Sequence, residues 1–262
     1  MAKVELILFD VFAFSGMFLV FVVIVTAWRL PRRVPRTETW AYFMLSTFLA
    51  SVVNVLIVGC QDGWDPNDAL CSLQAILNKT TEAWNAFAGA ALLLQVYLRL
   101  SHLNSTKPIP RGYIWLFGLE GWQPLTAHRD PIGMQCRLDS KLISRLINGL
   151  TAAGIIVMSM LKVLILSHIR SIRKMEGKIP SGVGLSVSSI VRGYVCNFFV
   201  FASLVACVLG EYSTQRWGLL LDGFGTALFP LLVGITFATQ TDMLSAWMFW
   251  RESDGGMKGI TV

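Results

Sequence analysis

The stretch LILFDVFAFSGMFLVFVVIVTAW, residues 6–28, decides the class of protein to which this chain belongs. Asp10 is its only charged residue, and about 20 mostly apolar residues suffice for a helix to cross the hydrocarbon core of a bilayer. The run is too long for the core of a cleavable signal peptide, and no clear small-residue cleavage site precedes the next loop. We therefore predict that residues 6–30 form a first transmembrane span that serves as its own insertion signal.

The composition of the whole chain agrees with a membrane protein. Of its 262 residues, 54% are hydrophobic and only 15% are charged, whereas a soluble domain of this length needs far more charge to cover its surface. In a soluble protein the net charge of +6 would suggest nucleic-acid binding. Here the basic residues lie in short loops between apolar segments, as the positive-inside rule describes. The composition therefore predicts the lipid bilayer, and no nucleic acid, as a partner.

Five later segments are also long and apolar enough to span a bilayer. Together with the first, they cover residues 6–30, 39–60, 70–100, 141–168, 185–210 and 217–240. We predict an all-α membrane protein in which residues 1–251 form one seven-transmembrane helix bundle. Residues 252–262 are glycine-rich and polar, and are expected to form a short, disordered cytoplasmic tail.

The charges of the connecting loops predict the orientation of the bundle. Loop 29–36 has four arginines, and loops 101–111 and 170–178 are also basic, whereas loop 61–69 has three aspartates and no basic residue. Since lysine and arginine accumulate in cytoplasmic loops, the basic loops and the C-terminus are assigned to the cytosol. The N-terminus then lies outside the cell, which requires an odd number of crossings. We expect an integral protein of the plasma membrane.

The fourth crossing is the weak point of this topology. Its only candidate is residues 113–125, whose apolar run falls well short of the ~20 residues expected and contains Glu120, Gln123 and Pro124. The segment could be a short or degenerate helix that its neighbours and local thinning of the bilayer stabilise. It could instead be a re-entrant or interfacial segment, or a helix from which part has been lost. We favour the degenerate crossing, because without it the basic loop 170–178 would lie outside the cell.

Two of the five cysteines are predicted to form a disulfide. Cys71 opens the third span on the outer face and Cys136 lies in the second outer loop, so both are in the oxidising compartment, where a disulfide persists. Cys60 also lies near the outer face and is a competing partner, and two unrelated thiols are the simpler alternative. A bridge between Cys71 and Cys136 would tie the loop over the mouth of the bundle.

Polar residues within the predicted spans mark a candidate ligand site, because burying them in lipid is costly. Lys79 and Glu82 are three residues apart on the third span and therefore share one helix face. They are either an internal structural ion pair or a ligand-contacting pair in an outer cavity. Residues that could line this site with them are Asn54, Asn85, Arg145, Asn148, Asn197 and Asp222. Each alone is more often an interhelical hydrogen bond than a ligand contact.

Short motifs in the third and seventh spans resemble those of a receptor superfamily. The third span contains LCSLQAIL at residues 70–77 and TEAWNAF at residues 81–87, and the seventh contains Phe229, Pro230 and Gly234. With the cysteine pair and the short loops, these motifs make the chain similar to G-protein-coupled receptors, and among them to the fungal receptors of the cyclic-AMP-receptor-like and secretin-like group. The Asp-Arg-Tyr and Asn-Pro-x-x-Tyr motifs of rhodopsin-like receptors are absent, and the seventh span has no lysine for a retinal Schiff base.

The resemblance covers about residues 6–251, with a fourth span that departs from the pattern, and it implies a signalling function. It implies that an extracellular small molecule or peptide binds among the spans, and that a heterotrimeric G protein binds at the cytoplasmic rim. The basic residues of that rim are Arg99, Lys162, Arg170, Arg173, Lys174 and Arg192. Plain topogenic charge in contact with anionic lipid is the alternative. Residues 243–250 place Leu244, Trp247 and Trp250 at helical spacing, which predicts an amphipathic eighth helix on the inner leaflet.

Two other functional classes compete with the receptor. A small polytopic transporter or channel is the main alternative, although no internal repeat relates the first three spans to the last three. A membrane enzyme ranks last, because the sequence has no glycine-rich phosphate loop, no Gly-x-Ser-x-Gly and no Cys-x-x-Cys, and its three histidines lie far apart. We therefore predict no enzymatic activity, no metal and no cofactor.

Overall fold

Six helices and one β-hairpin make up the part of the chain that the computed structural model describes. This part comprises residues 2–31, 36–58, 68–101, 127–129, 134–138, 140–176 and 216–248, with residues 198, 201–202 and 205–206. The helices are α1 (Ala2–Arg29), α2 (Glu38–Val55), α3 (Asp68–Ser101), α4 (Lys141–Glu176), α6 (Arg216–Ala238) and α7 (Thr241–Trp247). Strands β1 (Ala127–Arg129) and β2 (Cys136–Leu138) pair antiparallel.

Three of the described helices are long and apolar enough to cross a membrane, namely Lys3–Arg29, Leu142–Ser171 and Arg216–Ala238. The first of them, α1, shows why they need lipid. Its inward face is apolar, and its outward face exposes Val4, Ile7, Val11, Phe14, Phe18 and Phe21. A helix that is apolar on all sides has to be buried, and an exposed stripe of this length marks contact with a membrane. By length and composition, this is a membrane-embedded helical protein.

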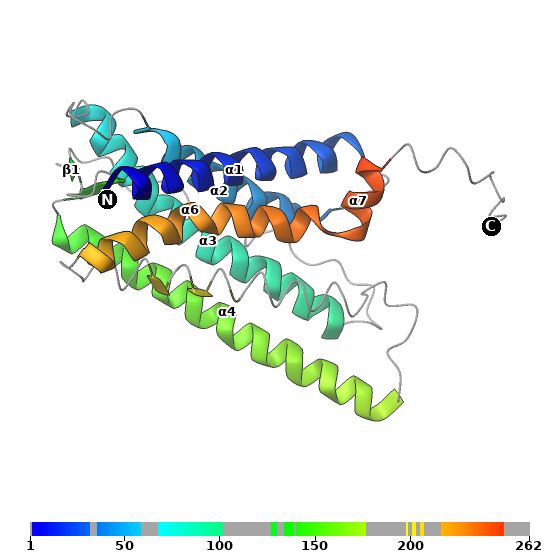
Figure 1. The fold of residues 1–262 in the computed structure, drawn as a ribbon. Helices are drawn as coiled ribbons and strands as arrows, with labels where there is room; N and C mark the ends of the chain where they lie inside the picture. Colours follow the sequence, from blue (N-terminus) through cyan, green and yellow to red (C-terminus); the bar gives the residue numbers. More distant parts are fainter. Residues whose placement is uncertain are drawn as a thin grey trace.

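The long helices lie side by side in a bundle (Figure 1). α1 packs along α6, α2 packs against α1, α3 and α6, and α4 packs along α3. Helices α1, α3, α4 and α6 run in one direction and α2 runs in the other (Figure 1). The N-terminus, the β-hairpin and the first residues of α4 and α6 gather at one end of the molecule, which we call the hairpin end. α7 lies at the opposite end, which we call the α7 end.

Helix α6 is the most enclosed of the three apolar helices. In the most apolar 18-residue stretch of α6, 61% of the residues are buried, against 28% in α1 and 33% in α4. α1 approaches it closely, because a Cβ added to Gly16 would come within 2.8 Å of the Leu231 backbone nitrogen. Gly154 of α4 meets α3 in the same way, where an added Cβ would lie 2.8 Å from the Ala86 Cβ. Small residues at such crossings allow the close packing by which helices associate in lipid.

Four of the predicted spans are confirmed as helices by α1, α3, α4 and α6. The second span, predicted over residues 39–60, is wrong at its C-terminal end, because α2 ends at Val55. There the Leu56 amide donates a hydrogen bond to the Val53 carbonyl, three residues earlier, in a turn tighter than that of an α-helix. Gln74 of α3 donates to the same carbonyl at 3.1 Å, so the last turn of α2 contacts α3.

Two predicted crossings lie wholly or mostly outside the described residues. The structure describes none of residues 113–125. Of residues 185–210 it describes only 198, 201–202 and 205–206, which are helical. The seven-transmembrane bundle therefore stays a prediction, and so does the disordered tail over residues 252–262.

The predicted amphipathic eighth helix is present as α7, but it is shorter than expected. It has seven residues and ends at Trp247, because Met248 leaves the helical conformation with φ −89° and ψ 43°. Met243 and Ala246 are its buried residues. The Trp247 Nε1 donates to the Thr26 hydroxyl at 2.9 Å, so α7 is tied to the last turn of α1.

Candidate ligand-binding site at the hairpin end

Cys71 and Cys136 form a disulfide, with their Cα atoms 5.3 Å apart, which confirms the predicted pairing. Cys71 lies in the first turn of α3 and Cys136 begins β2. The Cys136 amide also donates to the Gln74 Oε1 at 2.9 Å, and the Gln74 Nε2 donates to the Val53 carbonyl of α2. The first turns of α3 therefore hold the hairpin to the bundle both covalently and by hydrogen bonds.

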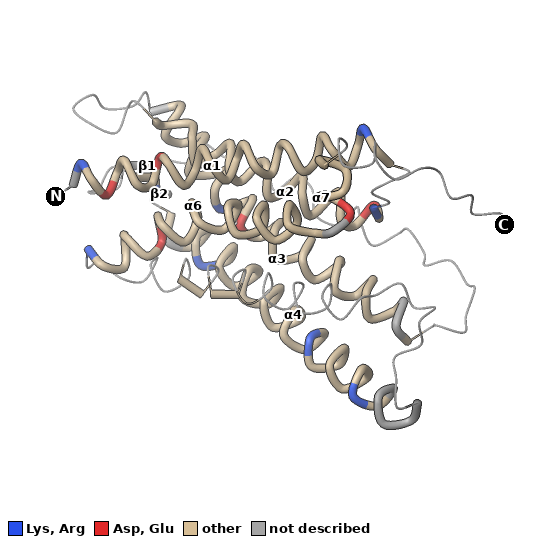
Figure 2. The backbone as a smooth tube through the Cα atoms, turned by 45° about the vertical axis from the view of Figure 1, so that its right-hand side comes forward, with Lys and Arg blue, Asp and Glu red and all other residues tan. Residues whose placement is uncertain are grey.

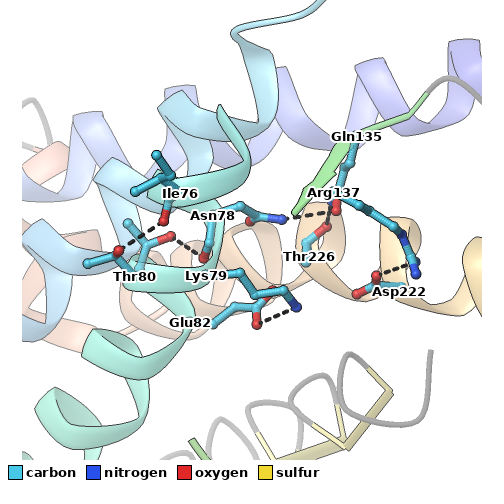
Figure 3. Close-up of polar contacts among 10 residues, drawn as sticks. Ile76, Asn78, Lys79, Thr80, Glu82, Gln135, Arg137, Asp222 and Thr226 are labelled. Atoms are coloured by element: carbon cyan, nitrogen blue, oxygen red, sulfur yellow. Dashed lines mark hydrogen bonds and ion pairs between the residues drawn. The ribbon is translucent and has the colours of Figure 1, made fainter. Parts of the chain in front are cut away.

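Gln135, just before β2, joins α3 to α6 (Figure 3). The Asn78 Nδ2 donates to the Gln135 Oε1 at 3.0 Å, and the Gln135 Nε2 donates to the Thr226 hydroxyl. The Thr226 hydroxyl donates in turn to the Gly223 carbonyl at 2.8 Å, and the Asn54 Nδ2 donates to the Thr226 carbonyl at 3.0 Å. A buried chain of hydrogen bonds thus links α3, the hairpin, α6 and α2, and a low dielectric strengthens such a network.

Arg137 and Asp222 form the second link between the hairpin and α6. Their Nη2 and Oδ2 atoms are 2.7 Å apart, and their side chains are only 15% and 5% exposed. Asp222 was predicted to belong to the candidate site, and its partner is a cation of the hairpin. Because both charges are largely withdrawn from water, removing either one leaves the other in an unfavourable environment.

Lys79 and Glu82 form the ion pair that their spacing on α3 predicts. The Lys79 Nζ lies 3.3 Å from the Glu82 Oε2, and both side chains are 8% exposed (Figure 3). The pair follows Asn78, which bonds the hairpin, on the face of α3 that also carries Cys71 and Gln74. Since charged groups in lipid are costly, they are expected to face the interior of a bundle, and this pair does.

Helix α4 adds two buried polar groups to the same layer. Asn148 and Thr151 are 4% and 1% exposed, and the Asn148 Nδ2 and Thr151 Oγ1 have no hydrogen-bond partner among the described residues. Gly154 of α4 meets Ala86 of α3, and both helices run in the same direction. Counting back about two turns on each helix from that contact places Asn148 at the depth of Lys79.

Two other predicted site residues lie elsewhere, and a third is outside the described residues. Arg145 is exposed on α4 and does not belong to the buried layer. The Asn85 Oδ1 lies 2.7 Å from the Ser46 Oγ and 3.3 Å from the Thr47 Oγ1 of α2, so Asn85 joins α3 to α2. Asn197 lies outside the described residues.

At the α7 end, Arg36 ties the segment between α1 and α2 to α7. Its Nη2 lies 2.7 Å from the Asp242 Oδ2 and donates to the Gln240 Oε1 at 2.5 Å, and its guanidinium lies 5.2 Å from the centre of the Trp40 ring. Burial lowers the pKa of the Arg36 guanidinium, and the carboxylate of Asp242 opposes that shift. Arginine keeps its charge at physiological pH, so this contact is an ion pair.

The predicted cytoplasmic rim is described in part. Arg99 lies in the last turn of α3, and Arg173 and Lys174 lie near the end of α4. The Lys162 Nζ lies 5.8 Å from the centre of the Phe201 ring, and Arg170 is exposed. Figure 2 shows basic residues on the far part of α4, toward the α7 end. Arg192 lies outside the described residues.

Several residues of the buried layer were missed by sequence reasoning. Gln74 and Asn78 carry a usable signal, because they follow Cys71 at helical spacing on one face of α3. Gln135 and Arg137 carry none beyond flanking Cys136, since their partners on α6 are 91 and 85 residues away along the chain.

No known family model matches the chain, and no curated protein is significantly similar to it. Among the described residues, no group of three or more histidine, cysteine, aspartate or glutamate side chains could hold a metal ion. The function is therefore argued from the geometry of the buried polar layer.

Proposed function

We propose that this protein is a seven-transmembrane receptor of the G-protein-coupled type, located in the plasma membrane with its N-terminus outside. In this proposal an extracellular small molecule or peptide binds at the hairpin end, and a heterotrimeric G protein binds at the α7 end. One observation carries the proposal. The buried Lys79–Glu82 pair lies beside the Asn78–Gln135 contact, beneath a hairpin that a disulfide anchors. Ionisable residues inside a membrane mark functional sites by default.

The directions of the helices support seven crossings. α3 and α4 are consecutive described helices that run in the same direction (Figure 1), so the chain returns to the hairpin end between them, and we assign this return to a further crossing. The same holds for α4 and α6. If α2 and α3 cross together with the three apolar helices α1, α4 and α6, the two returns would make seven crossings, which is the odd number that the loop charges also predict. The motifs in α3 and α6 that resemble those of fungal receptors agree with this arrangement.

The distribution of polar groups favours a receptor over a transporter or channel. The buried ion pairs and the hydrogen-bond chain lie at the hairpin end, whereas toward the α7 end the polar contacts between α2 and α3, through Asn85 and Gln95, are smaller. The helices there bury an apolar cluster that includes Trp40, Phe43, Val233, Phe237 and Met243. A transported solute would need polar groups along its whole path. A receptor needs them only where the ligand binds, because the signal passes onward as a change of helix packing.

A ligand at this layer would act by competing for the charges of Lys79 and Glu82. Breaking or reinforcing the pair would favour one of two packings of α3 against its neighbours. Pro230 lies inside α6, and a proline within a helix is a place where it bends. The bend would carry the change toward α7.

The test measures guanine-nucleotide exchange on a heterotrimeric G protein by the purified receptor in lipid nanodiscs, with a panel of amino acids, sugars and short peptides. We expect one class to raise the rate of exchange about 10-fold, which corresponds to a lowering of the activation free energy by about 1.4 kcal/mol. Glu82→Gln, which keeps the shape and removes the charge, should abolish the response. Arg216→Ala, which removes an exposed cation at the same end, should leave it unchanged.

A lasting absence of exchange across the panel would count against the receptor. If solute flux into proteoliposomes were then found, and were abolished by Glu82→Gln, the transporter would replace it.

A further inference from the structure

The segment from Met134 to Arg137 is seated more deeply than a covering loop needs to be. Met134, Gln135 and Cys136 are 1%, 4% and 3% exposed. A loop that only shields a cavity keeps its side chains near water, because loops run over the surface of a protein. Here consecutive side chains of the hairpin enter the bundle.

Each of these side chains meets a matching group of the helices. Met134 packs into an apolar cluster with Phe9 of α1 and Leu220 of α6. It rests on Gly223, where an added Cβ would lie 2.7 Å from the Met134 Sδ, so the glycine leaves room for the thioether. The helices thus form a seat for an apolar side chain at this point.

The polar side chains are recognised as specifically as the methionine. The Gln135 carboxamide receives a hydrogen bond from Asn78 of α3 and gives one to Thr226 of α6. The Arg137 guanidinium pairs with Asp222, one turn before Thr226 on α6. Figure 3 shows both side chains extending from the hairpin toward α6. The seat, formed by Asn78 of α3 and by Leu220, Asp222, Gly223 and Thr226 of α6, therefore binds an apolar group, a carboxamide and a guanidinium.

We propose that Met134–Arg137 is a built-in peptide ligand, and that the seat between α3 and α6 is a peptide-binding site. The segment makes there the contacts that an external peptide would make. The external ligand of this site is accordingly a short peptide with an apolar residue, a carboxamide and a cation in this order. The signalling consequence rests on the proposed receptor function, whereas the binding site does not.

The disulfide tether explains why Met134–Arg137, rather than an external peptide, occupies the site. The disulfide keeps Cys136 beside α3, and a short tether gives a segment an effective concentration of about millimolar or above. An external peptide of equal intrinsic affinity is therefore outcompeted. We expect it to bind the unaltered protein at least about 10-fold more weakly than a variant in which the segment has lost its contacts.

The test uses a fluorescent peptide Met-Gln-Ser-Arg-Leu, which is residues 134–138 with Cys136→Ser. Its binding is measured by fluorescence polarisation on the full chain in nanodiscs without G protein. The variant is Gln135→Ala/Arg137→Ala, which keeps the disulfide and removes the polar contacts of the segment. Arg216→Ala is the matched control, and a peptide with the same residues in scrambled order tests specificity.

We expect saturable binding to the double variant, at least about 10-fold weaker binding to the unaltered protein and to Arg216→Ala, and no saturable binding of the scrambled peptide. Equal binding to all three proteins would overturn the proposal, and so would no binding to any of them. If the double variant does not fold, Gln135→Ala alone is used, with the same expected order of affinities.

Peptide binding and nucleotide exchange separate this inference from the proposed function. Selective binding to the double variant without any effect on exchange would leave the peptide site standing and count against the receptor. Ligand-driven exchange with equal peptide binding to all three proteins would support the receptor and overturn the peptide site.

Discussion

The two ends of the bundle are held together in different ways. At the hairpin end a disulfide, a buried ion pair and a buried hydrogen-bond chain join the hairpin to α3 and α6. At the α7 end the described links are the ion pair of Arg36 with Asp242, whose side chains are 19% and 33% exposed, and the hydrogen bonds of Arg36 with Gln240 and of Trp247 with Thr26. They lie next to an apolar and aromatic core. There α3 and α4 also diverge from α1 and α6, as both views show (Figures 1 and 2).

The different contacts at the two ends predict where the bundle is rigid and where it moves. Covalent and buried polar links have definite partners and are costly to break. Apolar contacts and exposed ion pairs are less directional and can be remade in another packing. We therefore expect the hairpin end to keep its geometry while the α7 end rearranges.

The largest effect is expected from Asp222→Ala at the hairpin end. This change leaves the Arg137 guanidinium largely buried beside α6 without its carboxylate, and breaking such a pair costs about 3–5 kcal/mol. The free energy of unfolding in detergent measures it. The double variant Arg137→Met/Asp222→Leu should recover most of the loss, and a double variant as unstable as the single one would show that the charge pair is not the cause.

Removal of the disulfide should have the next largest effect. Cys71→Ala/Cys136→Ala frees a loop closed across a sequence separation of 65, and we expect a loss of about 2–4 kcal/mol. The unfolding midpoint with and without dithiothreitol gives an independent measure on the unaltered protein. An unchanged midpoint on reduction would mean that the noncovalent contacts alone fasten this end.

A smaller effect is expected where α4 joins the bundle. Gly154→Val would push against Ala86, and overpacking of this kind costs about 1–3 kcal/mol. Gly149→Ala is the control on the same helix, since nothing lies within 4 Å of its added Cβ, and it should be neutral or slightly stabilising. Thermal unfolding of both variants tests the contact, and equal midpoints would contradict it.

The smallest effect on stability is expected at the α7 end. Arg36→Ala removes a partly exposed ion pair with Asp242, and such pairs contribute about 0–1 kcal/mol. If this end is the mobile one, the same variant should nevertheless increase hydrogen exchange of α7 amides while leaving the first turns of α3 protected. Increased exchange at both ends would remove the distinction between them.

The sequence predicted most of the described helices and part of the site. Hydrophobic runs predicted α1, α4 and α6 because lipid requires long apolar helices. Compartment chemistry predicted the Cys71–Cys136 bridge, and helical spacing predicted that Lys79 faces Glu82. These predictions succeed because each depends on composition or on residues close together in the chain.

The remaining features depend on contacts between distant segments. The strands of the hairpin have three residues each, too few for an alternating pattern to show. The contacts of Gln135 with Thr226 and of Arg137 with Asp222 follow from where the disulfide holds the hairpin, which no local pattern encodes. The early end of α2 at Val55 likewise coincides with its contact with Gln74.

The bridge between Cys71 and Cys136 has a consequence for how the protein is made. Disulfides form and persist in oxidising compartments, so a bond of this kind closes only where both sulfurs meet in such a compartment. The two cysteines lie in α3 and β2, 65 residues apart along the chain. Formation of this bond during synthesis is therefore a chemical record that the first turns of α3 and the hairpin have been brought together.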